Sequence, residues 1–343
     1  MLFVGCRCEG GYYMNYRRLG KTDYHISEVS LGTWQVGGKW GSGFDDAHAE
    51  RIIHEAIDNG VNFIDTADVY EDGKSEAAVG RVVRSRQEQV YVASKCGRKI
   101  SPHVSGGYTP QVLRGFVETS LKNSGLERID LMQLHCPPTE VYYRPEIFEL
   151  FDRLQTEGKI GRFGVSVEKV EEGLKAIEYP NVAAVQIIFN IFRQRPAELF
   201  FEQAQRKDVG LIIRVPLASG LLTGKFSRDS KFSEGDHRNF NRSGEAFDKG
   251  ETFAGIEYEQ GLELVEELKE ICAECPESTL AQTALRWILM HSQVSTIIPG
   301  ASKPEQLLSN VQASELPPIP TDVFNRIEQL YMHKVKPLVH HRW

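Results

Sequence analysis

Four side chains capable of acid–base chemistry stand at or just after short apolar segments in the first half of the sequence. Asp65 ends the segment NFID, and Tyr70 lies in the loop that follows it. Lys95 ends VYVASK, and His135 ends IDLMQLH. Ionisable residues at strand ends beside loops are more typical of a functional site than of a core. Taken alone, the first stretch fits a turn-capping Asp65 and a half-buried Tyr70 equally well.

These residue types suit proton transfer to an oxygen. A buried ammonium needs a counter-ion, so Asp65 is the expected partner of Lys95. A phenol titrates near pH 10 in water, and a nearby cation is expected to lower that pKa. Tyr70 would then exchange a proton while His135 holds a carbonyl oxygen beside it. The group would serve an oxygen that gains charge as its carbon receives a hydride. The alternative is a structural Lys–Asp pair beside a surface tyrosine.

Short apolar strands alternate with amphipathic helices along the chain. Strands are predicted at residues 29–34, 62–67, 90–95, 129–135, 160–167, 183–190, 211–217 and 295–299. Helices are predicted at 46–59, 75–85, 110–123, 145–157, 168–178, 196–207, 258–273, 278–291, 304–313 and 321–332. This alternation indicates a parallel sheet that is buried on both faces.

The pattern predicts an α/β fold, a (β/α)8 TIM barrel with an N-terminal hairpin at 15–27 and a C-terminal helix at 321–332. A doubly wound open sheet is the competing fold. It would normally carry a GxGxxG turn after its first strand, whereas this sequence reads LGTWQVGG there. Active sites of such barrels lie at the carboxyl ends of the strands, so Asp65, Lys95 and His135 should meet at one mouth. By strand alternation, Cys96 and Cys136 should point outward, toward the helices.

Composition excludes several classes of protein. The chain has 343 residues, of which 41% are hydrophobic and 25% charged, and a net charge of −7. It has no Lys/Arg cluster for nucleic acid and no apolar run near the roughly 20 residues that a membrane span needs. Six cysteines without a regular framework indicate a reducing, cytoplasmic setting. The pairs Cys6/Cys8 and Cys272/Cys275 lack a second ligand pair, so no metal site is expected. Oligomeric state does not follow from the sequence.

Two segments stand outside the repeating pattern. Residues 1–14 are interpreted as a disordered N-terminal extension, with Met14 as the candidate natural start, and 15–343 as a single barrel domain. Residues 218–255 are rich in charge, Gly and Ser. Loops of this length are usually functional or disordered, so the segment is predicted to be a lid, the alternative being a flexible surface insertion.

Over residues 15–315 the sequence resembles the aldo-keto reductase family. The motifs that carry the resemblance occur in order: LGTW, FIDTADVYEDGKSE, VASK, LMQLH, VSVEK, VQIIFN, PLASGLLTGK and IPGASKPEQLLSN. The resemblance implies that Tyr70 is the general acid/base, that Lys95 and Asp65 adjust its pKa, and that His135 orients the substrate. It also implies interconversion of a small carbonyl compound and an alcohol by hydride transfer, without a metal, using NADP(H), with NAD(H) possible.

The same resemblance implies a path for the dinucleotide. Its residues are Gly32, Thr33, Trp34, Ser166, Gln186, Arg214, Leu217, Ser219, Gly220, Leu221, Gly300, Ser302, Lys303, Gln306 and Asn310. Ser166 and Gln186 would bind the nicotinamide amide, and Arg214 stands where many relatives stack a tyrosine on the nicotinamide ring. Lys303 is the cation expected to favour NADP(H). The departures are Val167, where Asn is common, Ser309, where an acidic residue is common, and Gln306, where several branches of the family have Arg.

Substrate identity does not follow from the sequence. Trp34, Tyr70, Phe189 and the loop 136–143 are predicted to line the substrate pocket. Besides a reductase, the resemblance allows a redox-sensing regulatory subunit that binds nicotinamide and retains slow catalysis. A metal-dependent barrel hydrolase or isomerase is a third hypothesis. The sequence lacks the cluster of metal-ligating residues that such an enzyme needs.

Overall fold

The computed structural model describes residues 4–7, 13–38, 43–275 and 277–343. Within these, parallel strands form the central sheet in the order in which they occur along the chain. They are β4 (Leu31–Gly32), β5 (Phe63–Asp65), β6 (Tyr91–Cys96), β7 (Ile129–His135), β8 (Ile160–Ser166), β9 (Val182–Ile188), β10 (Gly210–Arg214) and β11 (Val294–Ile297).

The first and last strands of this sheet meet and close it. Parallel bridges join Val29 to Ile297 and Gly32 to Gly300, and the Ser30 amide donates to the Ile297 carbonyl at 2.9 Å. With eight parallel strands in the described residues and closure at this seam, the predicted (β/α)8 barrel is confirmed.

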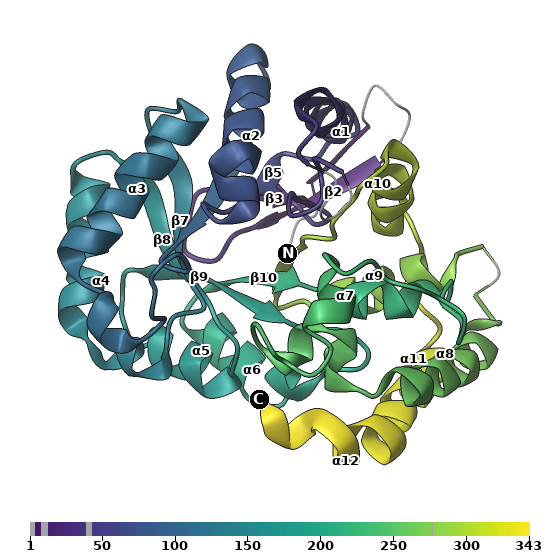
Figure 1. Ribbon diagram of the computed structural model, residues 1–343. Helices are drawn as coiled ribbons and strands as arrows, with labels where there is room; N and C mark the ends of the chain where they lie inside the picture. Colours follow the sequence, from purple (N-terminus) through teal and green to yellow (C-terminus); the bar gives the residue numbers. More distant parts are fainter. Residues whose placement is uncertain (1–3, 8–12, 39–42, 276) are drawn as a thin grey trace.

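Helices surround the barrel (Figure 1). They are α1 (Asp46–Asp58), α2 (Lys74–Ser85), α3 (Pro110–Ser124), α4 (Pro145–Thr156), α5 (Val170–Ala176), α6 (Phe200–Arg206), α7 (His237–Phe240), α8 (Tyr258–Cys272), α9 (Leu280–Leu289), α10 (Pro304–Val311), α11 (Thr321–Leu330) and α12 (Lys336–Val339). The start of α3 agrees with its sequence signals: the Thr109 side chain accepts from the Val112 amide, and Pro110 occupies the first turn. The helix predicted from residue 196 begins only at Phe200, after a 3-10 turn at Arg195–Ala197.

Two apolar layers result from strand alternation. The outer layer lies between the strands and the helices, and the inner one fills the barrel. The inner layer unites Phe63, Ala93, Leu131, Ala184 and Ile212 with Leu19, Tyr24 and Ile26 from the N-terminal hairpin. The hairpin therefore closes the amino-terminal end of the barrel and leaves the other end as the mouth.

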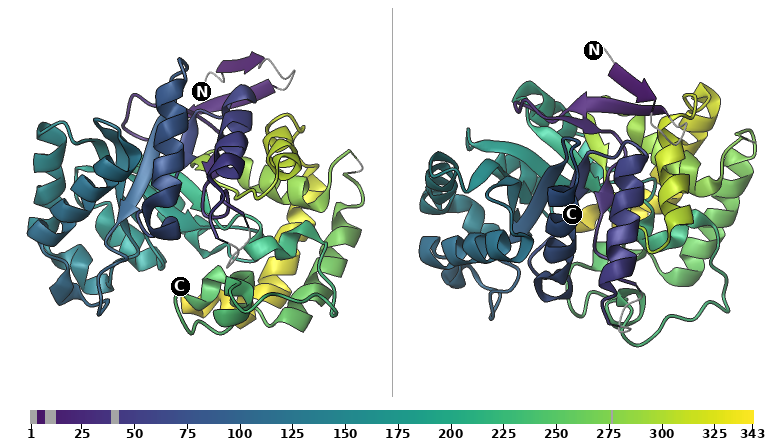
Figure 2. Two further views of the ribbon diagram at one scale, coloured as in Figure 1. Left: turned by 45° about the horizontal axis from the view of Figure 1, so that its top comes forward. Right: turned by 90° about the horizontal axis from the view of Figure 1, so that it is seen from above.

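That hairpin consists of β2 (Tyr13–Arg18) and β3 (His25–Ser27), which pair antiparallel as predicted. Where the sequence suggested neither helix nor strand, β1 (Val4–Arg7) pairs with β2, and Met14 is buried. These purple strands lie to one side of the barrel helices in Figure 2. Residues 1–3 and 8–12 lie outside the described residues, and the division into an extension at 1–14 and a domain at 15–343 stays a prediction.

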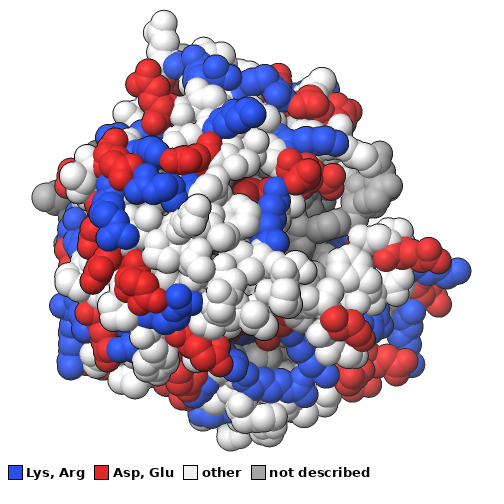
Figure 3. All heavy atoms as spheres, turned by 60° about the vertical axis from the view of Figure 1, so that its left-hand side comes forward, with Lys and Arg blue, Asp and Glu red and all other residues white. Residues whose placement is uncertain are grey.

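The surface carries both signs of charge. Figure 3 shows blue and red side chains interspersed over one face of the molecule. Pairs such as Arg114–Glu157 and Lys175–Glu178 are in contact at 2.6 and 2.5 Å. Among the described residues, no helix is both long enough and apolar enough to span a bilayer.

Candidate active site

Asp65, Lys95 and Tyr70 meet at the mouth of the barrel. The Lys95 ammonium lies 2.5 Å from the Asp65 carboxylate, 2.8 Å from the Thr66 carbonyl and 3.1 Å from the Tyr70 hydroxyl oxygen. Lys95 and Asp65 are 1% and 2% exposed, so the ion pair is shielded from water. An ammonium has three N–H groups, and these three acceptors use all of them. Because Tyr70 accepts from Lys95, its own hydroxyl proton is free to point elsewhere.

Two amides from strands further around the barrel complete the surroundings of Asp65. Gln133 on β7 and Gln186 on β9 donate to its second oxygen at 3.1 and 2.8 Å. The strand register places Lys95 beside Gln133, one strand along from Asp65. A buried carboxylate bonded to one cation and two amides is fixed in position, so it can hold Lys95 in one orientation.

Tyr70 is positioned by a tight turn between β5 and α2. The residues after it adopt left-handed conformations, with φ of 47° at Glu71, 54° at Asp72 and 86° at Gly73. Behind the turn, hydroxyl groups link Thr66 to Ser75 at 2.9 Å and Ser75 to Thr33 at 2.8 Å. These linked hydroxyl groups connect the ends of β4 and β5 to the first turn of α2. The sequence analysis did not predict them.

The expected fall in the pKa of Tyr70 is wrong in direction. Burial raises the pKa of the phenol above its usual value, and the opposing effect of Lys95 does not outweigh it. For Lys95 the balance is reversed: burial lowers the ammonium pKa, but the attraction of Asp65 leaves it raised overall. Tyr70 is therefore a neutral phenol held beside a charged ammonium at neutral pH, which makes it a proton donor.

His135 stands at right angles to Tyr70, with 6.1 Å between the ring centroids. Burial and the nearby cations Lys95 and Arg98 hold the pKa of His135 well below its usual value, so the imidazole is neutral. Its Nδ1 atom is buried and has no hydrogen-bond partner among the described residues. A neutral imidazole beside a phenol can donate one N–H to a carbonyl oxygen placed between them.

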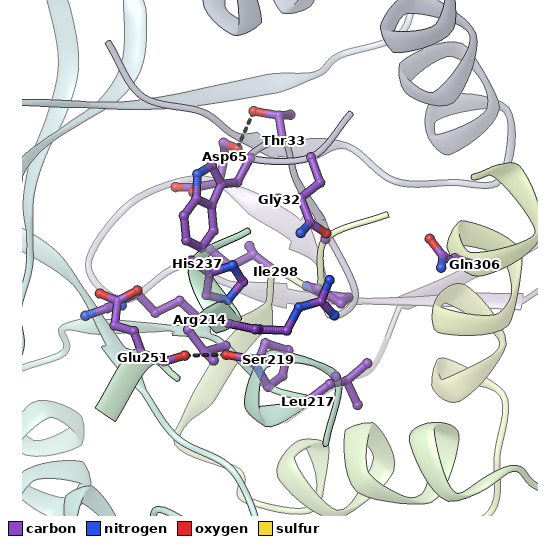
Figure 4. Close-up of a pocket in the computed structure, with 18 of the residues that line it drawn as sticks. Gly32, Thr33, Asp65, Arg214, Leu217, Ser219, His237, Glu251, Ile298 and Gln306 are labelled. Carbon is purple, nitrogen blue, oxygen red and sulfur yellow. Dashed lines mark hydrogen bonds and ion pairs between the residues drawn. The ribbon is translucent and has the colours of Figure 1, made fainter. Parts of the chain in front are cut away.

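A cavity of about 660 Å³ opens above these groups and extends to helix α10. Figure 4 shows Arg214, Ser219 and Glu251 grouped near one end and Gln306 set apart on α10. The predicted residues that line the cavity are Gly32, Thr33, Trp34, Asp65, Tyr70, His135, Gln186, Arg214, Leu217, Ser219, Gly220, Gly300, Gln306 and Asn310. Residues from opposite ends of the chain thus share one hollow.

Other predicted residues lie away from the cavity wall. Lys95 sits behind Asp65 and Tyr70, Leu221 is buried in the outer core, and Ser166 contacts the Cys136 sulfur at 3.6 Å. Ser302 and Lys303 are outside the lining as well. Within the described part of the loop 136–143, Cys136 alone reaches the cavity, and Phe189 instead stacks on Trp287 at 5.1 Å.

The segment 218–255 contributes lining residues that sequence reasoning did not name. They are Thr223, Lys225, Phe226, His237, Arg238, Phe240, Phe247 and Glu251. His237 packs on Trp34 at 4.9 Å, and Phe247 meets the same ring edge-on at 6.2 Å. Trp34 in turn lies 6.2 Å from Tyr70. The predicted lid therefore reaches the mouth of the barrel, and its aromatic residues were the available signal.

Arg214 is fixed in place by groups from three segments. It donates to Glu251 at 2.5 Å and to the Val167 carbonyl at 3.1 Å, and lies 3.7 Å from the Cys136 sulfur. The Glu251 carbonyl accepts a hydrogen bond from Ser219 (Figure 4). Arg214 thus links the end of β10 to the segment 218–255.

Cys136 does not lie where it was predicted, and its surroundings bear on the expectation that the protein has no metal site. Cys96 lies in the outer core as predicted, but Cys136 lines the cavity because the chain leaves strand geometry there, with φ of 46°. Its sulfur and the carboxylates of Glu168 and Glu251 lie within 4.8 Å of one another, the spacing of a metal site. The Arg214 guanidinium already supplies a cation for Glu251 there.

The distal part of the cavity fits an elongated anionic molecule. Lys225 supplies positive charge there, Arg238 adds a guanidinium that is paired with Asp236, and Gly300 leaves the backbone accessible. A side chain at Gly300 would meet no atom closer than 3.9 Å, so the space beside it is open. This part of the cavity fits a nucleotide with phosphate groups.

Comparison with known proteins gives one consistent result. The model of the aldo/keto reductase family matches residues 28–332. The chain is 31% identical over 314 residues to an NADH-specific methylglyoxal reductase of Escherichia coli, covering 86% of this chain and 92% of the relative. It is 28% identical over 341 residues to a probable voltage-gated potassium channel subunit beta of Arabidopsis thaliana, covering 94% and 98%.

A solved glycerol dehydrogenase of Gluconobacter oxydans superposes with a TM-score of 0.75 at 28% identity, covering 95% of this chain and 96% of that one. The match of the family model spans most of the barrel, including all four ionisable residues at its mouth. The chain therefore belongs to the aldo/keto reductase family of oxidoreductases.

Proposed function

We propose that this protein is an NADP(H)-dependent oxidoreductase that interconverts an aldehyde or ketone and the corresponding alcohol, with Tyr70 as the general acid/base. The observation that carries the proposal is the orientation of Tyr70. Its oxygen accepts a hydrogen bond from the buried Lys95, so its proton is available to a ligand in the cavity. When bound, the dinucleotide would supply or accept the hydride.

The residues at the mouth would divide the proton chemistry among them. Tyr70 donates its proton to the carbonyl oxygen as negative charge develops there. Lys95 stabilises the phenolate that remains, and Asp65 keeps Lys95 charged and in position. His135 donates a hydrogen bond that orients the same oxygen. In the alcohol-oxidising direction the steps run in reverse.

The cavity lining supports the remaining parts of the proposal. Leu217, Ser219 and Gly220 would lie along the diphosphate, and Asn310 beside the adenine. The segment 218–255 would close over the bound dinucleotide and exclude water. Lys303, which lies outside the lining at the start of α10, would favour the 2′-phosphate, so Lys303→Ala should reduce the NADPH/NADH ratio of kcat/KM roughly tenfold. An unchanged ratio would remove Lys303 from this role.

The direct test is NADPH oxidation against a panel of aldehydes and ketones. Tyr70→Phe removes one hydroxyl group and should lower kcat/KM by about 10²–10⁴-fold. Its unfolding temperature and its dissociation constant for NADPH should stay close to those of the unchanged protein. Undiminished turnover by Tyr70→Phe would refute the assignment of the general acid.

The relatives named as potassium channel beta subunits favour a second candidate, a nicotinamide-binding regulatory subunit with slow reductase activity. The two candidates differ in turnover. Multiple rapid cycles with an aldehyde, limited by substrate concentration, support the enzyme. A single slow cycle per bound dinucleotide, together with a co-purifying partner, supports the regulator.

A further inference from the structure

Arg98 lies at the cavity mouth in a position that the proposed chemistry does not explain. It follows Lys95 by three residues, and Gly97 turns the chain between them with φ of 102°. The turn brings the Arg98 side chain into the cavity lining with His135 and Cys136. A side chain at Gly97 would meet the Tyr108 ring at 2.8 Å, so the turn fixes this placement.

Most of the hydrogen-bonding capacity of Arg98 is unused. Its Nη1 atom contacts the Cys136 carbonyl, the Glu168 carboxylate and the His103 ring, each at 3.4 Å. These contacts are longer than the 2.7–3.2 Å usual for an N–H···O bond. Its Nε and Nη2 atoms have no hydrogen-bond partner in the described parts of the chain. Arg214 differs, because both of its terminal nitrogens donate to protein groups.

The charge around Arg98 is also incompletely balanced. The carboxylate in contact with it, Glu168, has its pKa raised to about 7 by burial and by the neighbouring Asp248. At this end of the cavity, the lining includes the guanidinium groups of Arg98 and Arg214 and the carboxylate of Glu251, which is already paired with Arg214. Arg98 therefore presents a cation beside the site where a carbonyl group would react.

We propose that Arg98 binds an anionic oxygen group, a carboxylate or a phosphate, carried by the carbonyl substrate. The planar guanidinium presents two parallel N–H groups that match such an anion. Trp34, which stacks beside Tyr70 and lines the same cavity as Arg98, offers an apolar surface for the carbon chain of such a substrate. The inference rests on the proposed function and narrows its substrate class to carbonyl compounds that carry a negative charge.

The test compares matched substrates that differ only in this charge. One pair is 4-oxobutanoate and butanal, and the other is glyceraldehyde 3-phosphate and glyceraldehyde. The unchanged enzyme should prefer at least one charged member by tenfold or more in kcat/KM. Arg98→Met should lose 10- to 100-fold on that member and less than threefold on its neutral counterpart. Arg98→Lys keeps the positive charge but not the two parallel N–H groups, so its loss of kcat/KM on the charged member should be intermediate.

The two pairs distinguish carboxylate from phosphate as the bound group. Arg114→Met, which removes a surface arginine paired with Glu157, serves as the matched control and should leave the preference unchanged. Equal losses on charged and neutral substrates in Arg98→Met would overturn the inference while leaving the proposed function intact. If no aldehyde is reduced, calorimetric binding of 4-oxobutanoate and of glyceraldehyde 3-phosphate to the NADPH complex decides: binding of either that requires Arg98 supports the inference, and its absence refutes it.

Discussion

The two ends of the barrel are built from the same strands but from opposite kinds of side chain. On β5, Phe63 lies in the inner apolar layer that fills the amino-terminal end of the barrel, hereafter the plug, and Asp65, two residues on, lies at the mouth. On β6, the same spacing separates Ala93 in the plug from Lys95 beside Asp65. Residues two apart on a strand share a face. The inward-facing side chains of one strand therefore change from apolar to charged between one inward-facing residue and the next.

Under the proposed function, the difference predicts that stability depends mainly on one end of the barrel and chemistry on the other. The plug gains from burial of apolar area, and its polar groups are the phenols of Tyr24 and of Tyr91, which stacks on Tyr24, among the residues of this cluster that the structure describes. The mouth buries an ion pair whose desolvation is costly, and it is tolerated because Lys95 and Asp65 are fully hydrogen-bonded. Substitutions at the plug should therefore act on folding, and substitutions at the mouth on catalysis, on pH dependence, or on both.

The largest effect is expected from Lys95→Met at the mouth. It leaves Asp65 buried without its cation and removes the donor to Tyr70, so kcat/KM should fall about 10²–10⁴-fold. The free energy of unfolding should fall by roughly 3–5 kcal/mol, as measured by urea denaturation. The double variant Lys95→Met/Asp65→Asn should recover stability but not turnover. Normal turnover in the single variant would show that the mouth does not depend on the charge of Lys95.

A smaller effect, on folding alone, is expected from Leu131→Ala in the plug. Loss of the buried side chain should lower the free energy of unfolding by roughly 2–5 kcal/mol. At temperatures well below unfolding, kcat/KM should change less than twofold, since the mouth keeps its hydrogen bonds. Calorimetry and steady-state rates on one preparation check both statements. A large loss of kcat/KM in the folded variant would show that the two ends are coupled.

The smallest effect concerns the pH dependence of stability. Burial and the nearby Glu76 raise the pKa of Asp68, just past the end of β5, to about 7. Between pH 4 and 7 the folded state then holds a proton that the unfolded state has released. The stabilising contribution is present below about pH 4 and is lost as pH rises through 7. The side chain of Asp68→Asn stays neutral at every pH. The free energy of unfolding of this variant, relative to that of the unchanged protein, should therefore rise by roughly 1–3 kcal/mol from pH 5 to pH 8.

Unfolding curves of Asp68→Asn at pH 5 and pH 8 measure this gain, with Asp229→Asn as an exposed control. Equal differences from the unchanged protein at both pH values would show that Asp68 ionises as it would in water. In that case the mouth would not carry this pH sensitivity.

Much of this arrangement was predictable from local patterns. The strands ending at Asp65, Lys95 and His135 were predicted within a residue or two of their observed bounds. An apolar run that ends in a polar residue is a local pattern, so it can be recognised in a single sequence. The N-cap of α3 at Thr109 was predicted from local capping rules. Convergence of the three strand ends followed from the parallel topology, which the alternation of elements indicated.

Contacts between distant segments were not predictable in this way. Trp34 meets His237 and Phe247, about 200 positions away, because the long segment after β10 folds back over the mouth. Cys136 was expected to face outward, but a left-handed residue at the strand end turns it into the cavity. Arg98 and Glu168 are brought together by separate loops at the same mouth.

The sequence by itself determined which elements form, in what order they pair, and which ionisable groups stand at the carboxyl ends of the strands. Only the tertiary structure decided the electrostatic state of those groups. The pKa of Tyr70 is the clearest case, because proximity to Lys95 lowers it while burial raises it, and burial prevails. The spacing of residues in the sequence predicts which side chains share one face of a strand. Desolvation of an ionisable group depends instead on every segment that excludes water from the site.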